Sequence, residues 1–296
     1  AFGNVYMGNW GTPFKRARIY TGANDTGHFG ASGLLTGHST TTLDGATRQL
    51  FSRRQNNLIS YDSPVFSGFQ VMAAYTATNN STLRPELSAN TKPRLWSLGA
   101  QYKNGPLKVT GAYERHTDHL AAAAGSPVPV VALGGFAGDE QGWLIGAEYT
   151  FSNNLKIGGM YTRQSWDTTG VVGAPAGFIG DSRVAAWTLG MEWVISGPHQ
   201  LKAAYIQAGD VKGNGVAAAG GLRPAAGTST GAKMYQIRYL HNLSKRTQLG
   251  VGYNAVKNDT FAGYNISGAG GNGGNGGGNG FGGKHSVIAV TVDHKF

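Results

Sequence analysis

The sequence predicts an all-β fold, a single transmembrane antiparallel β-barrel. Three observations predict it. Apolar and polar residues alternate along many short runs, and the connections between those runs are short and long in turn. The composition is also rich in glycine and poor in charge, with 48 Gly among 296 residues and 14% charged residues. Alternation with a period of two gives a strand one apolar and one polar face. Short turns at one rim and long loops at the other are typical of barrels that cross a membrane.

The alternation is clearest in the middle of the chain. In one run Trp96, Leu98 and Tyr102 share a face, and in a later run Trp187, Leu189 and Trp193 do the same. The intervening residues are mostly small or polar. We expect strands, in order along the chain, at about 1–9, 55–63, 66–78, 94–103, 106–116, 142–151, 154–164, 184–195, 199–208, 232–241, 246–257 and 284–296.

The connections support the barrel. Short ones occur at 103–106, 152–154, 196–198 and 241–245, and long ones at about 79–93, 117–141, 165–183, 209–231 and 258–283. The last contains GAGGNGGNGGGNGFGGK, from Gly268 to Lys284, and we expect residues 258–283 to form a Gly-rich extracellular loop. A phosphate-binding loop is excluded there because a strand follows it where a helix would be required. A soluble all-β protein is the alternative, but it would need a second sheet to cover the apolar face.

Composition argues against several functions. The chain has no Cys, which removes disulfide scaffolds, thiolate nucleophiles and Cys-based zinc sites. Its eight histidines are dispersed along the chain, so we expect no enzyme, no metal site and no cofactor. We expect the segment from His116 to His119 to be a solvated junction between strand and loop. The net charge of +10 comes from bases spread singly, which does not indicate nucleic acid.

Two stretches resemble the general, non-specific porins of Gram-negative bacteria, in particular the trimeric porins of β-proteobacteria. Residues 54–69, RQNNLISYDSPVFSGF, resemble the strand that follows the constriction loop of that family. The last strand ends in the aromatic Phe296, whose face carries Ile288, Val290, Val292 and His294. This ending resembles the signal that the barrel assembly machinery reads.

The resemblance implies sixteen strands in the full protein, with about twelve represented here. Residues 2–8 resemble the fifth strand of the family, so about four strands would precede residue 1. A genuine twelve-stranded barrel is the alternative. The resemblance also implies that residues 10–52 are the constriction loop, folded into the channel; an ordinary extracellular loop is the alternative. The whole chain, 1–296, is expected to be one barrel domain.

For function, the resemblance implies a water-filled channel in the bacterial outer membrane for passive diffusion of ions and small hydrophilic solutes. The implied partners are small anions and other solutes, outer-membrane lipid and lipopolysaccharide, the assembly machinery, and two further copies in a homotrimer. A substrate-specific channel and a closed structural or adhesive barrel are the alternatives. A closed barrel would differ from an open pore in single-channel conductance, because it would give no steady open steps.

Selectivity in such pores comes from charged groups that face each other across the narrowest point. If Ile59 and Tyr61 face the membrane, the period of two turns Arg54, Asn56, Ser60 and Asp62 inward. The same parity turns Lys108, Lys156, Lys202 and Arg238 inward. Because acidic residues are scarce in 10–52, we expect an anion preference. The candidate constriction residues are Arg54, Arg16, Arg18, Arg48, Asp25, Asp44, Lys108 and Arg238.

Overall fold

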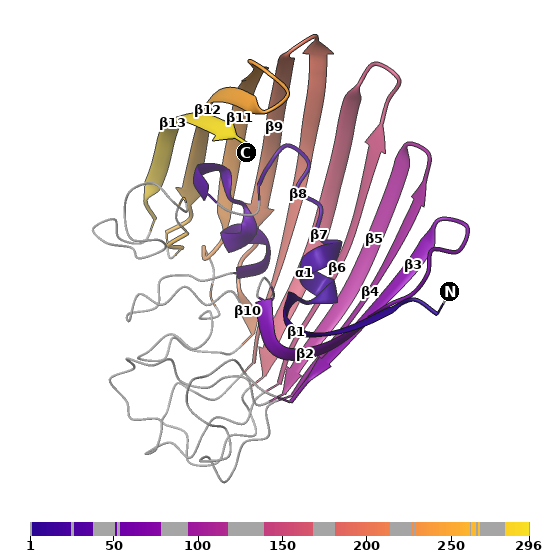
Figure 1. Cartoon of the computed structure of the whole chain (residues 1–296). Coiled ribbons are helices and arrows are strands. Elements are labelled where there is room, and N and C mark those ends of the chain that lie inside the picture. The colour runs from indigo at the N-terminus through magenta and orange to yellow at the C-terminus, as the bar shows by residue number, and fades with distance from the viewer. Residues whose placement is uncertain are drawn as a thin grey trace.

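A computed structural model describes residues 2–24, 27–37, 51, 54–77, 94–117, 139–167, 181–213, 227, 229–260, 262–264, 266 and 282–295. Within them the chain is a meander of antiparallel strands (Figure 1). The strands are β1 (Asn4–Gly11), β2 (Arg54–Asp62), β3 (Phe69–Thr76), β4 (Arg94–Asn104), β5 (Leu107–Thr117), β6 (Asp139–Thr150), β7 (Leu155–Asp167), β8 (Asp181–Ser196), β9 (His199–Ala208), β10 (Lys212–Gly213), β11 (Ala232–Asn242), β12 (Thr247–Asn258) and β13 (Lys284–His294).

Each long strand pairs with the next one along the chain, and the two-residue β10 pairs with β8. Every long strand overlaps a run that the alternation predicted, so the all-β meander is confirmed. Strands β1 and β13 form the two edges of the sheet. The described strands therefore make one strongly curved sheet that is not closed on itself, with a concave and a convex face (Figure 1).

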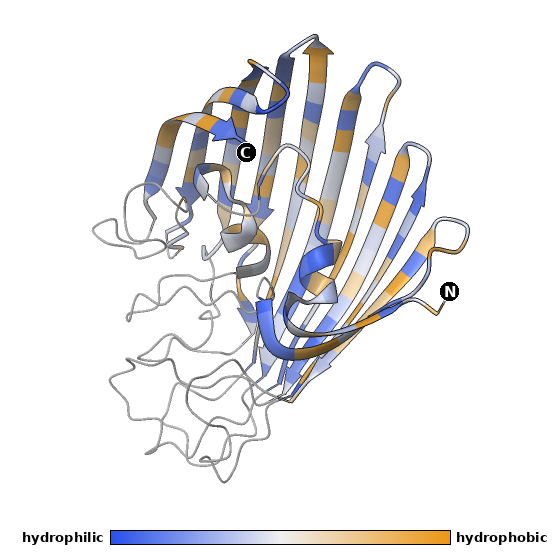
Figure 2. Ribbon diagram, viewed as in Figure 1, coloured by the Kyte–Doolittle hydropathy of each residue, from blue (hydrophilic) through white to orange (hydrophobic). Residues whose placement is uncertain are grey.

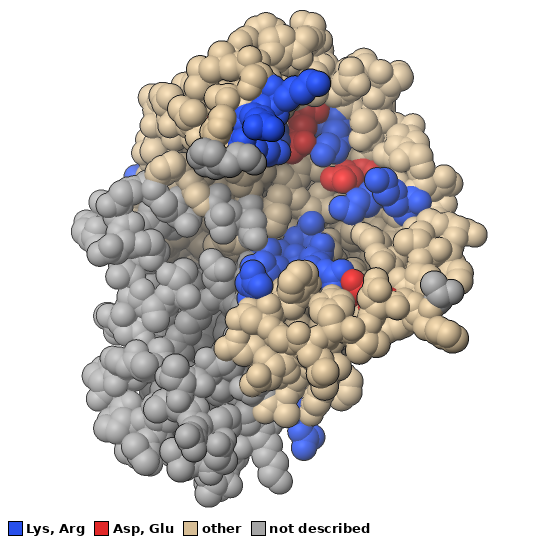
Figure 3. Space-filling view, in the orientation of Figure 1, with Lys and Arg blue, Asp and Glu red and all other residues tan. Residues whose placement is uncertain are grey.

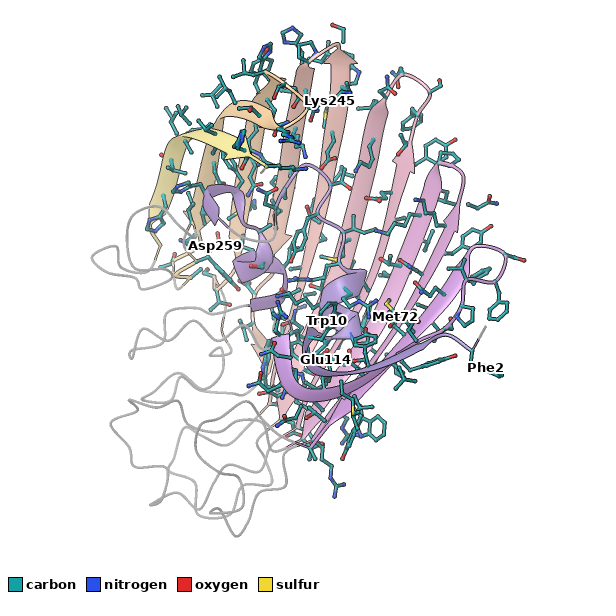
Figure 4. The ribbon with its side chains drawn as sticks, viewed as in Figure 1. Phe2, Trp10, Met72, Glu114, Lys245 and Asp259 are labelled. Carbon is teal, nitrogen blue, oxygen red and sulfur yellow. The ribbon has the colours of Figure 1, made fainter. Side chains whose placement is uncertain are left out.

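Short turns join consecutive strands at one end of the sheet, the end marked by Lys245 (Figure 4). Their geometry explains their sequences. Gly105 and Gly197 have φ of 53° and 52°, and Asn154 has φ of 61°. Glycine and asparagine are the residues that enter this left-handed region most readily, so these turns reverse the chain within a few residues.

The two faces differ in polarity, as Figure 2 shows by the alternating bands along the strands. On the convex face, large apolar side chains such as Leu98, Ile145 and Leu189 are about half exposed. On the concave face, polar side chains such as Ser97, Thr162 and Gln164 are buried. Among the described residues, no helix is long and apolar enough to cross a membrane.

The segment after β1 turns onto the concave face (Figure 1). It contains α1 (Pro13–Ala17), a 3₁₀ turn η1 (Gly27–Phe29) and a π turn η2 (Gly33–Gly37). Thr12 caps α1 by accepting a hydrogen bond from the Lys15 amide at 3.2 Å, and Pro13 occupies the first turn, where its missing N–H costs nothing. We call residues 12–37 the inner segment; its buried apolar side chains, with those of the strands, form the main core.

Candidate functional site

Glycines on the concave face create the space in which the inner segment lies. A Cβ atom at Gly190 would lie 1.9 Å from the carbonyl oxygen of Thr21, and one at Gly158 would lie 2.3 Å from the Thr21 hydroxyl. Gly252 stands in the same way against Phe29, where a Cβ would be 2.6 Å from the ring. Only glycine permits such close approach of backbone to backbone. These glycines therefore determine where the inner segment can lie across β7, β8 and β12.

A row of charged side chains crosses the concave face beside the inner segment. Lys108 on β5 lies 3.7 Å from Glu148 on β6. Glu192 on β8 lies between Lys156 at 2.9 Å and Lys202 at 3.2 Å, which project from the neighbouring strands. Register pairs Lys108 with Glu148 on adjacent strands. Further along the sheet it pairs Lys156 with Glu192, Glu192 with Lys202, and Lys202 with Arg238. We call this set the charged belt: Lys108, Glu148, Lys156, Glu192, Lys202 and Arg238.

The inner segment bonds directly to the charged belt. The Thr21 hydroxyl donates to Glu148 at 3.2 Å, and the Gly22 amide donates to Glu192 at 3.3 Å. Arg238 donates to the Asn24 side-chain oxygen at 3.0 Å, and its guanidinium lies 4.7 Å from the centre of the Phe29 ring. Figure 3 shows basic and acidic side chains gathered around a hollow on this face. The belt holds four cationic and two acidic groups, so its formal charge is positive.

A second charged group lies at the start of the inner segment. Arg16 makes two hydrogen bonds to Asp62 of β2, at 2.9 and 2.6 Å, and also donates to the Tyr6 hydroxyl. The paired hydrogen bond raises the pKa of the Arg16 guanidinium above its usual value. The alternation correctly turned Ser60 and Asp62 toward this face, where both are buried. Asp62 is thus neutralised by a cation that the inner segment brings to it.

Arg18 lies further into the inner segment and is buried. Its Nε donates to the Lys15 carbonyl at 2.9 Å and its Nη1 to the Tyr20 hydroxyl at 2.7 Å. The guanidinium also lies 5.0 Å from the centre of the Tyr20 ring. Arg16, Arg18, Lys108 and Arg238, four of the candidate residues, therefore gather on the concave face. Asp25, Asp44, Arg48 and Phe296 lie outside the described residues and stay predictions.

Arg54 is placed differently from the parity argument. Asn57 has φ of 52°, and the register of β1 against β2 shifts between Gly8 and Trp10. This irregularity inserts an extra residue, so Gln55 and not Arg54 continues the buried face of Leu58. Arg54 is exposed, and its guanidinium donates to the side chain and the carbonyl of Asn9. The inward placement of Arg54 and Asn56 is therefore corrected, because alternation does not carry across Asn57.

One buried charged cluster was missed in the sequence. His116 lies between Glu114 and Glu140, 2.8 and 2.7 Å away, and all three side chains are fully buried. The expectation of a solvated junction at His116 is wrong. Phe51, which returns the chain to β2, stacks on the imidazole with ring centres 4.7 Å apart and covers Gly142. The shared parity of Glu114 and His116 was the available signal, while Glu140 could be found only from strand register.

These two ring nitrogens both meet carboxylate oxygens, so two protons must lie between the three groups. A buried carboxylate without a partner is costly, and Figure 4 places Glu114 well away from the short-turn end. The cluster therefore fixes β5 to β6 beneath Phe51.

Comparison with known proteins gives consistent matches. A family described as Gram-negative porin matches residues 1–260. Outer membrane porin protein 32 of Delftia acidovorans is 26% identical over 196 residues, which is 66% of this chain and 44% of that porin, less than two thirds of its length. The solved anion-selective porin from Comamonas acidovorans has a TM-score of 0.70 and 22% identity, covering 100% of this chain and 75% of that one. For OmpT of Vibrio cholerae the TM-score is 0.64 at 15% identity, over 99% and 76% of the two chains, a likeness of fold.

The glycines that face the inner segment give a first prediction. Gly190→Ala should displace the inner segment around Thr21, because the added Cβ meets a backbone oxygen that has no flexible way to move. Hydrogen exchange at residues 19–24 should rise. Gly111→Ala is the control, since a Cβ there meets only the Leu144 oxygen at 3.7 Å. Equal exchange in the two variants would show that the space at Gly190 does not determine the position of the inner segment.

The buried cluster makes a second prediction. His116→Ala leaves two buried carboxylates without their shared partner and should lower the free energy of unfolding by about 3–5 kcal/mol. Arg115→Ala removes the neighbouring ion pair with Asp139, whose side chains are 52% and 44% exposed, and should cost less than about 1 kcal/mol. Denaturant unfolding of the protein in lipid vesicles measures both. A similar loss in the two variants would contradict the proposed role of the cluster.

Proposed function

This chain belongs to the Gram-negative porin family, and from that premise we propose that it forms a water-filled channel for ions and small hydrophilic solutes, with a preference for anions. The family and its outer-membrane relatives place the chain in the outer membrane of a Gram-negative bacterium, which it crosses many times. Porins are passive channels and not enzymes, so membership of the family supports a channel here. The solute preference and the assembly are our proposals.

The inner segment lies within residues 10–52, which we propose as the constriction loop. It occupies part of the concave face, which becomes the channel wall in a porin fold. It carries Arg16 to Asp62 of that wall, while Arg18 bonds within the segment. Its hydrogen bonds to Glu148 and Glu192 hold its backbone against the wall at the level of the charged belt. Solutes would pass through the space that the segment leaves open. We propose that this level sets the size limit and the charge preference.

The observation that carries the anion preference is how the acidic groups are used. Asp62 is bonded to Arg16, Glu148 faces Lys108, and Glu192 lies between two lysines. Each carboxylate is thus offset by at least one cation, and the belt retains a positive excess. A positive field in a narrow, water-filled passage attracts anions and repels cations. A solved structure of this fold is itself named an anion-selective porin, which supports the proposal for this chain.

We also propose a homotrimer, in keeping with a solved trimer form of OmpT from Vibrio cholerae. The convex face offers the apolar surface that contacts between copies and with lipid would use. The Gly-rich stretch 258–283 as an extracellular loop stays a proposal in the same way. None of these affects the argument from the belt.

Ion selectivity tests the proposal. In planar bilayers with a salt gradient, the reversal potential of the wild-type channel should show anions carrying most of the current. Lys156→Gln and Arg238→Gln should each lower the anion-to-cation permeability ratio, because each removes a positive charge from the channel wall. Arg115→Gln removes the same charge from the exposed pair with Asp139 and should change the ratio little.

The reversal potential also distinguishes Arg16, on the concave face, from Arg54, which lies away from it. Arg16→Gln should change selectivity more than Arg54→Gln, because Arg16 lies on the concave face while Asn57 turns Arg54 away from it. A channel that carries mainly cations would overturn the anion preference. A larger effect of Arg54 would restore the parity argument.

The convex face gives a stability prediction. Leu189→Arg places a charge on the apolar face at mid-strand and should lower the free energy of unfolding in lipid by about 2–4 kcal/mol. Leu243→Arg, in the short turn between β11 and β12, should cost at most about 1 kcal/mol because it lies near the interface. Unfolding in vesicles with denaturant measures the difference. Equal costs would mean that the convex face at Leu189 does not meet hydrocarbon.

A further inference from the structure

Two histidines lie opposite each other at the short-turn end of the sheet. His199 is the first residue of β9, and His241 is the last but one of β11; the register pairs them directly. Their neighbours on the same face, two residues along, are Leu201 and Tyr239, and Tyr239 is an exposed residue of the convex face. Both imidazoles are therefore on the convex side, at the rim of the sheet that Lys245 marks in Figure 4.

The two rings point the same type of nitrogen at each other. The Nδ1 atom of His241 lies 3.4 Å from the Nδ1 atom of His199, and the ring centres are 4.9 Å apart. Two nitrogens that each lie about 2.0–2.1 Å from one tetrahedral ion are themselves about 3.3–3.4 Å apart. The pair is thus already spaced as two ligands of a single ion, with little movement of either side chain required.

From this geometry we propose that His199 and His241 form a binding site for a divalent transition-metal ion, of the class Cu²⁺, Ni²⁺ or Zn²⁺. Neutral imidazole is the side-chain ligand that these ions share, and Cu²⁺ binds a given nitrogen site most tightly. The described residues bring no third His, Cys, Asp or Glu to the pair. Water completes the coordination, since both rings are partly exposed at the rim.

The surroundings of the pair fit an ion. The hydroxyl of Tyr239 also lies within hydrogen-bond distance of Nδ1 of His199, so two polar groups converge on one nitrogen. An ion at this point would link β9 to β11 by side chains in addition to the backbone ladder. The site lies on the outer rim, apart from the charged belt and the inner segment. It therefore stands whether or not the channel prefers anions.

Copper titration tests the site directly. Full-length protein without a histidine tag, folded in detergent, is titrated with CuCl₂ by calorimetry, and the bound ion is examined by electron paramagnetic resonance. We expect one saturable site per chain with the hyperfine pattern of two nitrogen ligands.

Variants identify the ligands. His199→Gln and His241→Gln should each weaken binding at least tenfold, because each breaks the chelate, and the double variant should bind at least as weakly as either because no imidazole remains. His294→Gln is the matched control: it lies at the same rim, bonded to Thr247 at 2.9 Å, and should bind like the wild type. Circular dichroism confirms that each variant is folded. Wild-type affinity in both single variants, a signal without two nitrogens, or an equal loss in His294→Gln would each overturn the proposal.

Discussion

Side chains along a β-strand point alternately to its two faces, and this period of two governs most of what the structure does. It places large exposed apolar side chains on the convex face, and it places both polar groups and the apolar side chains that pack against the inner segment on the concave face. Hydrogen bonds between neighbouring strands satisfy the backbone polar groups, so the main difference between successive residues is the face of the sheet on which the side chain lies. A single inserted residue exchanges the two faces for the residues beyond it, and this occurs at Asn57.

On the concave face the inner segment packs closely against the strands, and the charged belt lies beside it. The inner segment fits because glycines such as Gly158 and Gly190 remove the side chains that would stand in its way. Once it is in place, its polar groups meet the carboxylates of the belt, and its arginine meets Asp62. Steric fit and charge pairing act on the same residues. The segment is therefore positioned by shape and oriented by electrostatics.

Sequence alone recovers what depends on local pattern. The long strands, their short turns and the inward direction of Lys108 and Arg238 all follow from parity and turn residues. Contacts between residues far apart in the sequence do not follow. Glu140 joins His116 only because the register brings β6 beside β5, and Phe51 stacks on His116 from a distant part of the chain. Arg54 was misplaced for a related reason, since an asparagine in a left-handed conformation gives no sign of itself in an alternating sequence. The roles of Asp25, Asp44, Arg48 and Phe296 stay predictions.

Glu192, shared by Lys156 and Lys202, has a consequence for how such a protein can change over time. The strands that carry these residues are held together by backbone ladders, which are indifferent to the charge of a side chain at the water-filled face. Replacement of that carboxylate by a neutral or basic residue would alter the local charge by one or two without disturbing strand order or register. Related sequences could thus drift between solute preferences by small steps in charge, while the architecture that carries them stays constant.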